Sequence, residues 1–188
     1  MTPRFAPFTT WMDWHTGLLD PERGQVERRL SDMSGYYLDE QGVDGGQLVY
    51  RVFAIPVEET GSEIQCSTTV IEPGRVADEY FMTKGHFHAV WHRSEVYLGL
   101  RGEGRLVMAT EAGEHAVEPI RPGSVSYVPG GWAHRSVNVG DEQLVFFAAY
   151  VGDAGHDYGT IADRGFPVRV VAGAHGPEVV DNPRYRKE

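Results

Sequence analysis

The amino-acid sequence predicts an all-β protein, a sandwich or barrel that follows a short N-terminal helical arm. Beyond residue 45 the chain divides into short segments that are apolar or that alternate between apolar and polar residues. Glycine or proline stands at most of the boundaries between these segments. Many short strands joined by glycine-rich turns, with little helix, are typical of β-sandwiches and β-barrels.

The clearest helical pattern lies in the N-terminal part, in LDPERGQVERRLSDMSG. Asp20 can cap a helix, and Pro21 suits the first helical position. Val26, Leu30 and Met33 then recur at steps of four and three residues, which is the spacing of one helix face. We therefore expect an α-helix in this arm.

The strands expected after the arm are bounded by turn residues. In chain order they lie in GQLVYRVFAIPVE, GSEIQCSTTVIEPG, EYFMTKGHFHA, SEVYLGLRGEGRLVMAT, HAVEPIRPGSVSYVP and HRSVNVGDEQLVFFAAYV, with one or two more in FPVRVVAGAHGPEVVDNPRYRKE. The chain has 188 residues and shows no repeat or linker, so we expect a single domain over 1–188. Residues 1–44 would form the arm, and 45–188 the barrel and a polar tail.

Charge and composition restrict the classes of partner. The formal net charge of −10 argues against nucleic acid or an anionic membrane, and an anionic substrate would need local hydrogen-bond donors. The one cysteine, Cys66, lies in a strand-like run and is expected to be a small core residue in a reducing compartment. We expect neither a signal peptide nor a membrane span, and predict a cytoplasmic protein.

The segment TKGHFHAVWHRSEVYLGLRGEG brings three histidines close to a glutamate. On a strand, His86 and His88 would point to the same face and could offer two imidazoles to one ion. Glu95 stands an odd number of residues beyond His88, so an unbroken strand would place it on the other face. A turn within AVWHRS would reset the register and bring Glu95, with Tyr97 and Gly99, to that face from a neighbouring strand.

A further histidine, His134, follows a Pro-Gly-Gly turn at the start of another expected strand. Three imidazoles and one carboxylate suit Fe(II), Mn, Ni, Zn or Cu(II), and leave two positions of an octahedral ion open. Alternatively, the HxH pair is exposed, or holds one buried histidine with a hydrogen-bond partner. His92 is expected at the tip of the turn, in solvent or at the rim of the site.

His15, His115 and His175 stand in polar surroundings without the spacing of metal ligands, and we expect them on the surface.

Together these segments resemble the two motifs of the cupins, a superfamily of small β-barrels. The second motif, G-x5-P-x-G-x2-H-x3-N, is matched by Gly123, Pro129, Gly131, His134 and Asn138. The first is matched by His86 and His88 and by the glutamate and glycine at Glu95 and Gly102. It departs from the usual pattern because six residues separate His88 from Glu95, more than most cupins have.

This longer gap, with the strings KGHFHA, EVY, DAGHDYGTI and VVDNPRY, is similar to the cupin-type phosphoglucose isomerases. The resemblance spans roughly residues 45–185. It implies a cupin barrel (a double-stranded β-helix, or jelly roll) that interconverts fructose 6-phosphate and glucose 6-phosphate in glycolysis and gluconeogenesis. It also implies one divalent metal ion per subunit, with Fe(II) first and Mn, Ni or Zn as alternatives.

By the same resemblance the metal ligands are His86, His88, Glu95 and His134, the set that the residue types had suggested. Catalytic roles would fall to Glu95, His134, His156 and Tyr97. Substrate would contact Tyr50, Thr69, Thr83, Gly85 and Tyr158. Tyr50 and Thr69 could instead be plain sheet residues, and Gly85 a simple bulge.

Isomerisation moves a hydrogen between C1 and C2 of the sugar. A cation near both oxygens would stabilise a cis-enediolate, and Glu95 is the best-placed base, although a metal-bound carboxylate is less basic. A direct hydride shift is the alternative. Lys84 is the nearest cation to the ligand pair and stays an open candidate for the phosphate.

Other functions share the same ligands. A metal-dependent cupin dioxygenase would need an apolar pocket and would consume oxygen, whereas a sugar-binding cupin would need no base. Within isomerases, mannose 6-phosphate is a second candidate substrate. Exposed sheet edges commonly pair between subunits, so we expect a homodimer, with the arm as an element that the subunits could exchange.

Overall fold

The computed structural model describes residues 6–22 and 24–187, and nearly all of its regular structure is β-strand. The strands are β1 (Trp11–Met12), β2 (Leu19–Asp20), β3 (Gly24–Arg29), β4 (Leu48–Ala54), β5 (Ile64–Ile71), β6 (Arg75–Val76), β7 (Glu79–Tyr80), β8 (Glu95–Arg101), β9 (Gly104–Ala109), β10 (His115–Ile120), β11 (Val125–Val128), β12 (Ala133–Asn138), β13 (Leu144–Val151), β14 (Val168–Gly173) and β15 (Gly176–Asp181). A turn of 3-10 helix, Leu30–Met33, and one α-helix, α1 (Gly159–Arg164), complete the described part.

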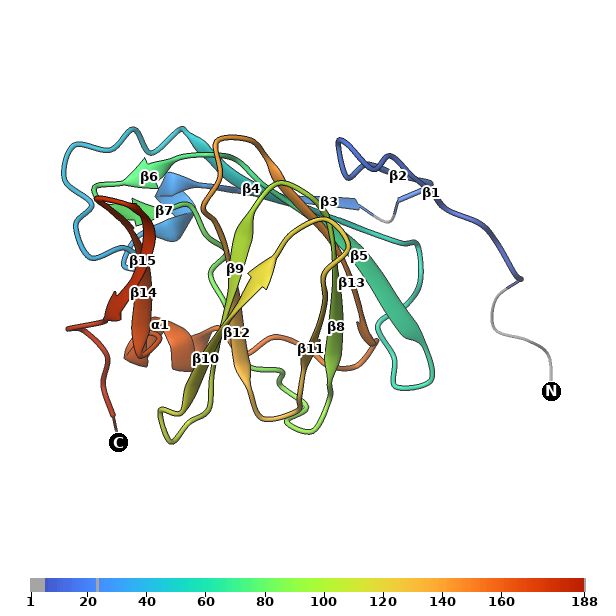
Figure 1. Ribbon diagram of the computed structural model, residues 1–188. Helices are drawn as coiled ribbons and strands as arrows, with labels where there is room; N and C mark the ends of the chain where they lie inside the picture. The colour runs from blue at the N-terminus through green and yellow to red at the C-terminus, as the bar shows by residue number, and fades with distance from the viewer. Residues whose placement is uncertain (1–5, 23, 188) are drawn as a thin grey trace.

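Two antiparallel sheets form the body of the molecule. One has the strand order β11-β8-β13-β5-β4-β3, and the other has the order β10-β9-β12. Figure 1 shows the smaller sheet lying across from the larger one, with α1 and the β14–β15 hairpin at one end of the barrel. A sheet β15-β14-β7-β6 and the pair β1-β2 are added to this body. The predicted all-β class is therefore confirmed, with the sheets arranged as in a jelly roll.

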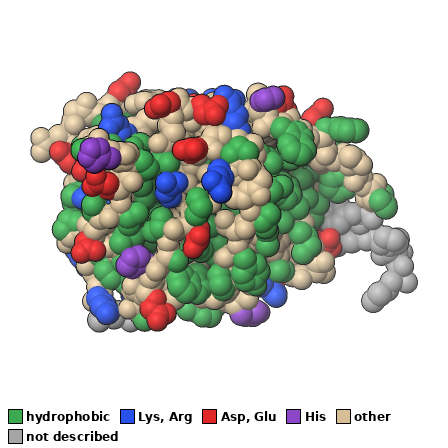
Figure 2. All heavy atoms as spheres, viewed as in Figure 1, with side chains coloured by type: hydrophobic (Ala, Val, Ile, Leu, Met, Phe, Trp, Pro, Cys, Tyr) green, Lys and Arg blue, Asp and Glu red, His purple; other side chains and the backbone are tan. Residues whose placement is uncertain are grey.

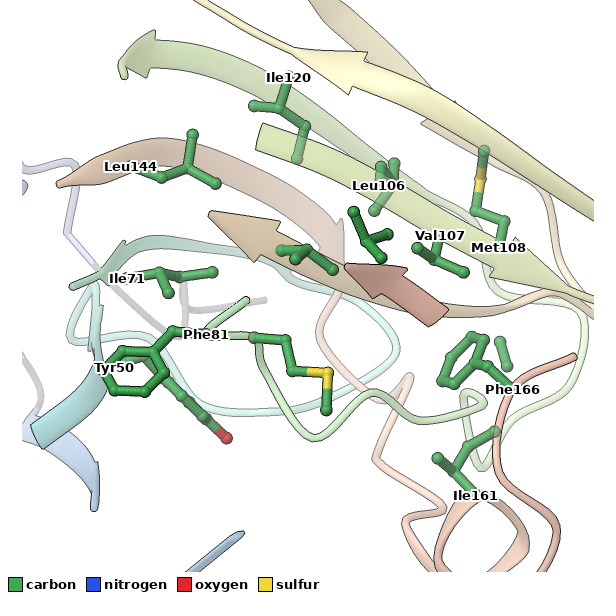
Figure 3. Close-up of a cluster of buried hydrophobic side chains, with 14 of the residues drawn as sticks. Tyr50, Ile71, Phe81, Leu106, Val107, Met108, Ile120, Leu144, Ile161 and Phe166 are labelled. Carbon is green, nitrogen blue, oxygen red and sulfur yellow. The ribbon is translucent and has the colours of Figure 1, made fainter. Parts of the chain in front are cut away.

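The hydrophobic core fills the space between the two main sheets. Leu106 and Ile120 come from the smaller sheet, and Ile71 and Leu144 come from the larger one. Their side chains point toward one another in Figure 3. Burial of apolar side chains from both inner faces is what holds two such sheets together.

The helix predicted from Pro21 onward is wrong. Gly24–Arg29 form β3, an edge strand that pairs with β4 along its whole length, and only Leu30–Met33 turn into a 3-10 helix. Leu30 and Met33 are buried as predicted, but Val26 is exposed. Backbone hydrogen bonds to β4 outweigh a weak helical spacing. Part of the segment, Arg23, lies outside the described residues.

The strand expected over EYFMTKGHFHA is interrupted. β7 ends at Tyr80, and the chain then runs beside β12 through the isolated bridges of Met82 with Val137 and His86 with His134. The pairing register shifts by one residue between these two bridges, which is the signature of a β-bulge. Gly85, with a φ of 73°, lies within the bulge. The other expected strands are present, including both in the C-terminal segment.

Cys66 lies on β5 and is half-buried rather than within the core. Burial raises the pKa of its thiol, which disfavours the nucleophilic thiolate. No helix in residues 6–22 and 24–187 is long and apolar enough to cross a membrane.

Asn138, the last residue of the second motif, is fully buried at the end of β12. Its Nδ2 donates to the carbonyls of Ile71 and Glu142 at 2.9 and 2.8 Å, and its Oδ1 accepts from the amide of Gly140 at 3.0 Å. This side chain ties β12 to β5 and to the turn before β13. Its presence in the motif therefore has a structural reason.

Replacement of Asn138 by alanine is expected to lower the free energy of unfolding by about 2–4 kcal/mol, because one buried and two partly buried backbone groups lose their partner. Urea denaturation followed by tryptophan fluorescence would measure the change. Gln41→Ala, at an exposed loop position, is the control and should change stability by less than about 0.5 kcal/mol. A loss below about 1 kcal/mol for Asn138→Ala would contradict this account.

Candidate active site

Three imidazoles and one carboxylate meet at one end of the barrel interior. One ligand atom from each of His86, His88, Glu95 and His134 lies within 4.8 Å of all the others. The two first histidines lie on the bulged segment after β7, whereas Glu95 begins β8 and His134 stands near the start of β12. Three separate stretches of chain therefore contribute to one cluster.

Backbone pairing brings the first histidine against the last. The amide of His86 donates to the carbonyl of His134 at 3.2 Å, and the amide of His134 donates to the carbonyl of His86 at 3.0 Å. The two imidazole centroids are 4.5 Å apart. On β8, Glu95, Tyr97 and Gly99 are all buried, so they share the inner face as expected.

The long gap between His88 and Glu95 has a structural use. It forms the predicted turn, with His92 exposed at the tip, and places the carbonyl of Arg93 2.8 Å from Nδ1 of His88. The Arg93 guanidinium makes two hydrogen bonds of 2.8 Å to the carboxylate of Asp153. Both contacts come from Arg93. A shorter gap would leave no residue whose carbonyl could accept from His88 and whose side chain could pair with Asp153.

The ring nitrogens are oriented as metal ligands require. Nδ1 of His88 lies against the Arg93 carbonyl, and Nδ1 of His134 lies 3.3 Å from the carbonyl of Trp132. If each Nδ1 carries a proton and donates it to its carbonyl, Nε2 has a free lone pair for a metal. A carbonyl in this position is the usual support of a ligating histidine. The buried Nε2 atoms of His86 and His134 have no hydrogen-bond partner among the described residues.

Such orphaned buried nitrogens are costly unless something occupies the space between them. Nε2 of His134 also lies 3.0 Å from Oε2 of Glu95, in contact but without hydrogen-bonding geometry. The donor set, three neutral imidazoles and a carboxylate, fits a divalent transition-metal ion. The residues present therefore suit the metal that the sequence pattern predicted.

The protonation state of each side chain in the cluster depends on its neighbours. Burial alone would raise the pKa of the Glu95 carboxyl, but contacts with His134 and His88 outweigh it and hold the pKa at about 2. Burial lowers the pKa of His88, but the Glu95 carboxylate and the Arg93 carbonyl outweigh burial and raise that pKa above 6.5. Burial and neighbouring imidazoles hold the pKa of His86 well below 6.5.

Metal binding should therefore depend on pH through His88. Its raised pKa means that the ring keeps a proton below that pKa and loses the proton as the pH rises through it. A metal must displace this proton, so we expect affinity to increase as the pH rises through that pKa and more than half a proton per chain, on average, to be released at pH 6.5. Calorimetric titration with Zn(II) in two buffers of different ionisation enthalpy would measure the release.

His92→Asn is the control for this measurement, because His92 is exposed and outside the cluster. It should release the same number of protons as the unchanged protein. Zn(II) binding that releases no proton at pH 6.5 would contradict the protonation state derived for His88.

A narrow pocket opens over the cluster, and its walls include most of the residues predicted from the family resemblance. All four predicted catalytic residues and all five predicted substrate contacts line it, whereas His88 stands behind the lining. The lining comprises Tyr50, Val52, Ser67, Thr69, Thr83, Lys84, Gly85, His86, Glu95, Tyr97, His134, Ser136, Phe146, Ala148, Tyr150, His156 and Tyr158.

One end of the pocket offers donors for an anion. Thr83 accepts from the amide of Ser136 at 3.1 Å, which leaves its hydroxyl proton to donate. The amide of Gly85 donates to no described residue. Lys84 Nζ lies 5.4 Å from the ring centre of Tyr36, and desolvation followed by the charge of Arg28 lowers the pKa of Lys84. Two cations thus stand near this end.

Aromatic rings also surround the cluster. The rings of His156 and Tyr158 stack at 5.6 Å, and His156 lies 4.4 Å from the ring of His86. Burial lowers the pKa of His156, which favours the neutral ring. Burial raises the pKa of Tyr97 well above 10, so its hydroxyl stays protonated as a donor.

Sequence reasoning missed several residues of this pocket. Ser67, Ser136 and Tyr150 lie on strands whose pattern gives no functional signal. Arg28 was placed on a helix, although β3 pairs it directly with Tyr50 of β4. His15, His115 and His175 are exposed, as expected.

Comparison with known proteins gives one consistent family. The family model described as "Glucose-6-phosphate isomerase (GPI)" matches residues 27–184. The chain is 45% identical to the glucose-6-phosphate isomerase of Pyrococcus furiosus over 186 residues, which covers 96% of this chain and 98% of that one. It is 37% identical to the enzyme of the same name from Sinorhizobium medicae, covering 100% of this chain and 91% of that one.

Among solved structures, an oxalate decarboxylase is similar with a TM-score of 0.46 and 25% identity. The match covers 56% of this chain and 26% of that one.

Proposed function

The chain belongs to the glucose-6-phosphate isomerase family in its cupin form, and from that premise we propose that it interconverts fructose 6-phosphate and glucose 6-phosphate. The observation that supports this most directly is the cluster of His86, His88, Glu95 and His134 beside a pocket whose lining also offers donors for an anion. Such a pocket suits a small molecule with a charged group and two adjacent oxygens.

The four clustered side chains would hold one divalent ion. When bound, the ion supplies positive charge that stabilises negative charge developing on O1 and O2 of the sugar. Fe(II) is our first choice, with Mn, Ni and Zn as alternatives, because the donor set suits all of them. The histidines contribute by orienting their Nε2 atoms, and the Arg93 and Trp132 carbonyls fix that orientation.

Glu95 would move the proton between C1 and C2. It is the one carboxylate in the described pocket lining, and its low pKa keeps it ionised at neutral pH. Tyr97, a protonated neighbour on the same face of β8, would donate to a sugar oxygen. His156, held neutral, would accept or donate a proton at the ring oxygen during ring opening.

The phosphate would bind at the Thr83–Gly85 end. Thr83 offers a hydroxyl, Gly85 an amide, and Lys84 with Arg28 supplies positive charge against the net negative charge of the chain. Tyr50, Thr69 and Tyr158 complete the contacts that we assign to substrate. An acidic protein needs local hydrogen-bond donors to bind an anionic substrate, and these residues would supply them.

A coupled assay would test the function. The protein is stripped with a chelator and then restored separately with Fe(II), Mn(II), Ni(II) and Zn(II), and formation of glucose 6-phosphate from fructose 6-phosphate is followed. We expect no turnover in the stripped protein and restored turnover with at least one ion. Stoichiometric metal binding without turnover for every ion would overturn the proposal and favour a dioxygenase or a binding protein.

We also infer a single domain that acts as a homodimer in the cytoplasm, where glycolysis and gluconeogenesis take place. The first described segment, from residue 6 to β2, lies at one side of the molecule in Figure 1 and carries Trp11 and Trp14, which are 76% and 64% exposed. Figure 2 shows hydrophobic side chains gathered on this face toward the arm. Large exposed apolar groups of this kind usually mark an interface.

Replacement of both Trp11 and Trp14 by serine should shift the protein from dimer toward monomer, raising the dimer dissociation constant by about tenfold or more. Sedimentation velocity over a range of concentrations would measure it. Val179→Ser, an exposed apolar position on β15, is the control and should leave the dimer unchanged. A monomeric unchanged protein at all concentrations would contradict the inference.

A further inference from the structure

A second cavity, of about 450 Å³, lies outside the pocket described above. It is enclosed by residues 35–38, by the C-terminal half of α1, by Arg169 on β14, and by residues 182–186. Figure 1 shows α1, β14 and the C-terminal segment together at one end of the molecule. Neither the family resemblance nor the proposed reaction gives this cavity a role.

The cavity gathers positive charge in an acidic protein. Among the described residues, five arginines but only two acidic residues line it, although the chain as a whole has 17 lysines and arginines and 27 acidic residues. The five are Arg135, Arg164, Arg169, Arg184 and Arg186, and the acidic pair is Glu79 and Asp163. The lining therefore carries a net charge of +3, while the whole chain carries −10.

Part of this positive charge has no described carboxylate beside it. Arg184 donates to the carbonyls of Tyr37 and Leu38 at 2.9 and 2.6 Å, and no described carboxylate lies within ion-pair distance of it. Arg169 lies within ion-pair distance of Glu79 at 3.4 Å and of Asp78 at 3.7 Å, yet its Nε and Nη1 are buried without a hydrogen-bond partner among the described residues. Carbonyls satisfy donors but leave the positive charge in place.

Arg135 lines this cavity, whereas its chain neighbours His134 and Ser136 line the substrate pocket. It is 7% exposed, and its Nε and Nη2 both donate to the carbonyl of Lys84, at 3.2 and 2.7 Å. None of the described residues accepts a hydrogen bond from its Nη1. Its guanidinium carbon lies 4.6 Å from the ring centre of Phe166, and no described acid pairs with it directly. A buried guanidinium without a paired acid is unusual, because burying a charge is costly.

We propose that this arginine-lined cavity binds a phosphate-type oxyanion, at a site separate from the substrate pocket. Guanidinium groups match phosphate oxygens in geometry and charge, and here they converge from β12, β14 and the C-terminal segment. An anion between them would neutralise Arg135 and would engage the unpartnered donors of Arg169. The volume admits a phosphate group together with a small organic part.

Binding of inorganic phosphate would test the proposal, with the metal-loaded protein at constant ionic strength. The substrate pocket is also expected to bind phosphate, so the measurement starts from Thr83→Val/Lys84→Met, which removes donors from that pocket alone. Equilibrium dialysis should still find one phosphate per chain in this background. Adding Arg184→Gln and Arg186→Gln should then weaken binding by about tenfold or more.

Controls separate the cavity from net charge and from misfolding. Arg105→Gln/Arg121→Gln removes two arginines elsewhere and should change the affinity by less than about twofold. The Arg186 side chain makes no hydrogen bond to any described residue, so Arg186→Gln alone should fold normally and still weaken binding by about threefold. Loss of all phosphate binding in the pocket-disabled background, or equal weakening by cavity and control variants, would overturn the proposal.

Discussion

Replacement of Glu95 by glutamine is expected to lower kcat for fructose 6-phosphate isomerisation by about 1,000-fold or more, the largest effect of any single change in the pocket. The amide keeps the size of the side chain but cannot take up a proton at neutral pH. Glu95 is 5% exposed and lies 3.2 Å from Nε2 of His88 and 3.0 Å from Nε2 of His134. The coupled assay at saturating substrate, with metal content measured in the same samples, gives the result.

Metal content distinguishes loss of the base from loss of the ion. Three imidazoles remain in Glu95→Gln, so we expect the variant to bind metal more weakly but to saturate at high concentration, still without turnover. Glu79→Gln is the control, because Glu79 is equally buried but lies outside the pocket. The folded control should keep kcat within about threefold of the unchanged protein. A metal-saturated Glu95→Gln with kcat within tenfold of normal would remove Glu95 from the proposed role.

The same reaction in deuterated water tests how the hydrogen moves. Proton transfer by Glu95 exchanges the carried hydrogen with solvent, so deuterium should appear at C2 of the glucose 6-phosphate formed. A direct hydride shift would leave C2 without deuterium. We expect incorporation, and its complete absence in the early product would contradict the base role and favour the hydride route.

The sequence indicated the cluster well because its information is local. His86 and His88 are two residues apart. The polar residues between His88 and Glu95 indicate the turn that precedes Glu95. His134 followed a Pro-Gly-Gly turn that set the start of β12. Alternation along a strand and a turn at each boundary indicated that all four side chains could reach one barrel interior, and the family resemblance then implied that they form one ligand set.

What the sequence could not indicate depends on pairing between distant segments. The pairing of Arg93 with Asp153 joins residues 60 positions apart, and no local pattern predicts it. Arg28 was missed for a related reason. The spacing of Leu30 and Met33 imitates a helix face, whereas the hydrogen bonds that make Gly24–Arg29 a strand come from β4. With the helix assumed, the neighbour of Tyr50 could not be recognised.

Gly85 is a second position at which a small change should have a large effect. An added Cβ would lie 2.7 Å from Cε2 of Phe166 and 3.0 Å from both Cβ of Arg135 and the carbonyl oxygen of His134. That oxygen accepts the hydrogen bond from His86, so the clash falls on the contact that joins two proposed ligands. The backbone φ of 73° adds a cost for any residue with a side chain.

Gly85→Ala is therefore expected to lower the free energy of unfolding by about 2–5 kcal/mol and to weaken Zn(II) binding by about tenfold or more. Gly123→Ala is the matched control. Its φ of 84° is equally left-handed, but a Cβ there would meet nothing within 4 Å. It should cost only about 1–2 kcal/mol and leave Zn(II) affinity unchanged. Denaturant unfolding and calorimetric titration would measure both quantities.

Comparing these two variants separates the effect of a Cβ clash with neighbouring atoms from the effect of the left-handed backbone conformation. If both lose the same stability and neither changes Zn(II) affinity, then left-handed backbone alone explains the glycine at position 85. If only Gly85→Ala weakens the metal site, the bulge requires glycine because the chain passes so close to Phe166 and His134. We expect the second result, since the reciprocal hydrogen bonds of His86 and His134 leave the bulge no room to move outward.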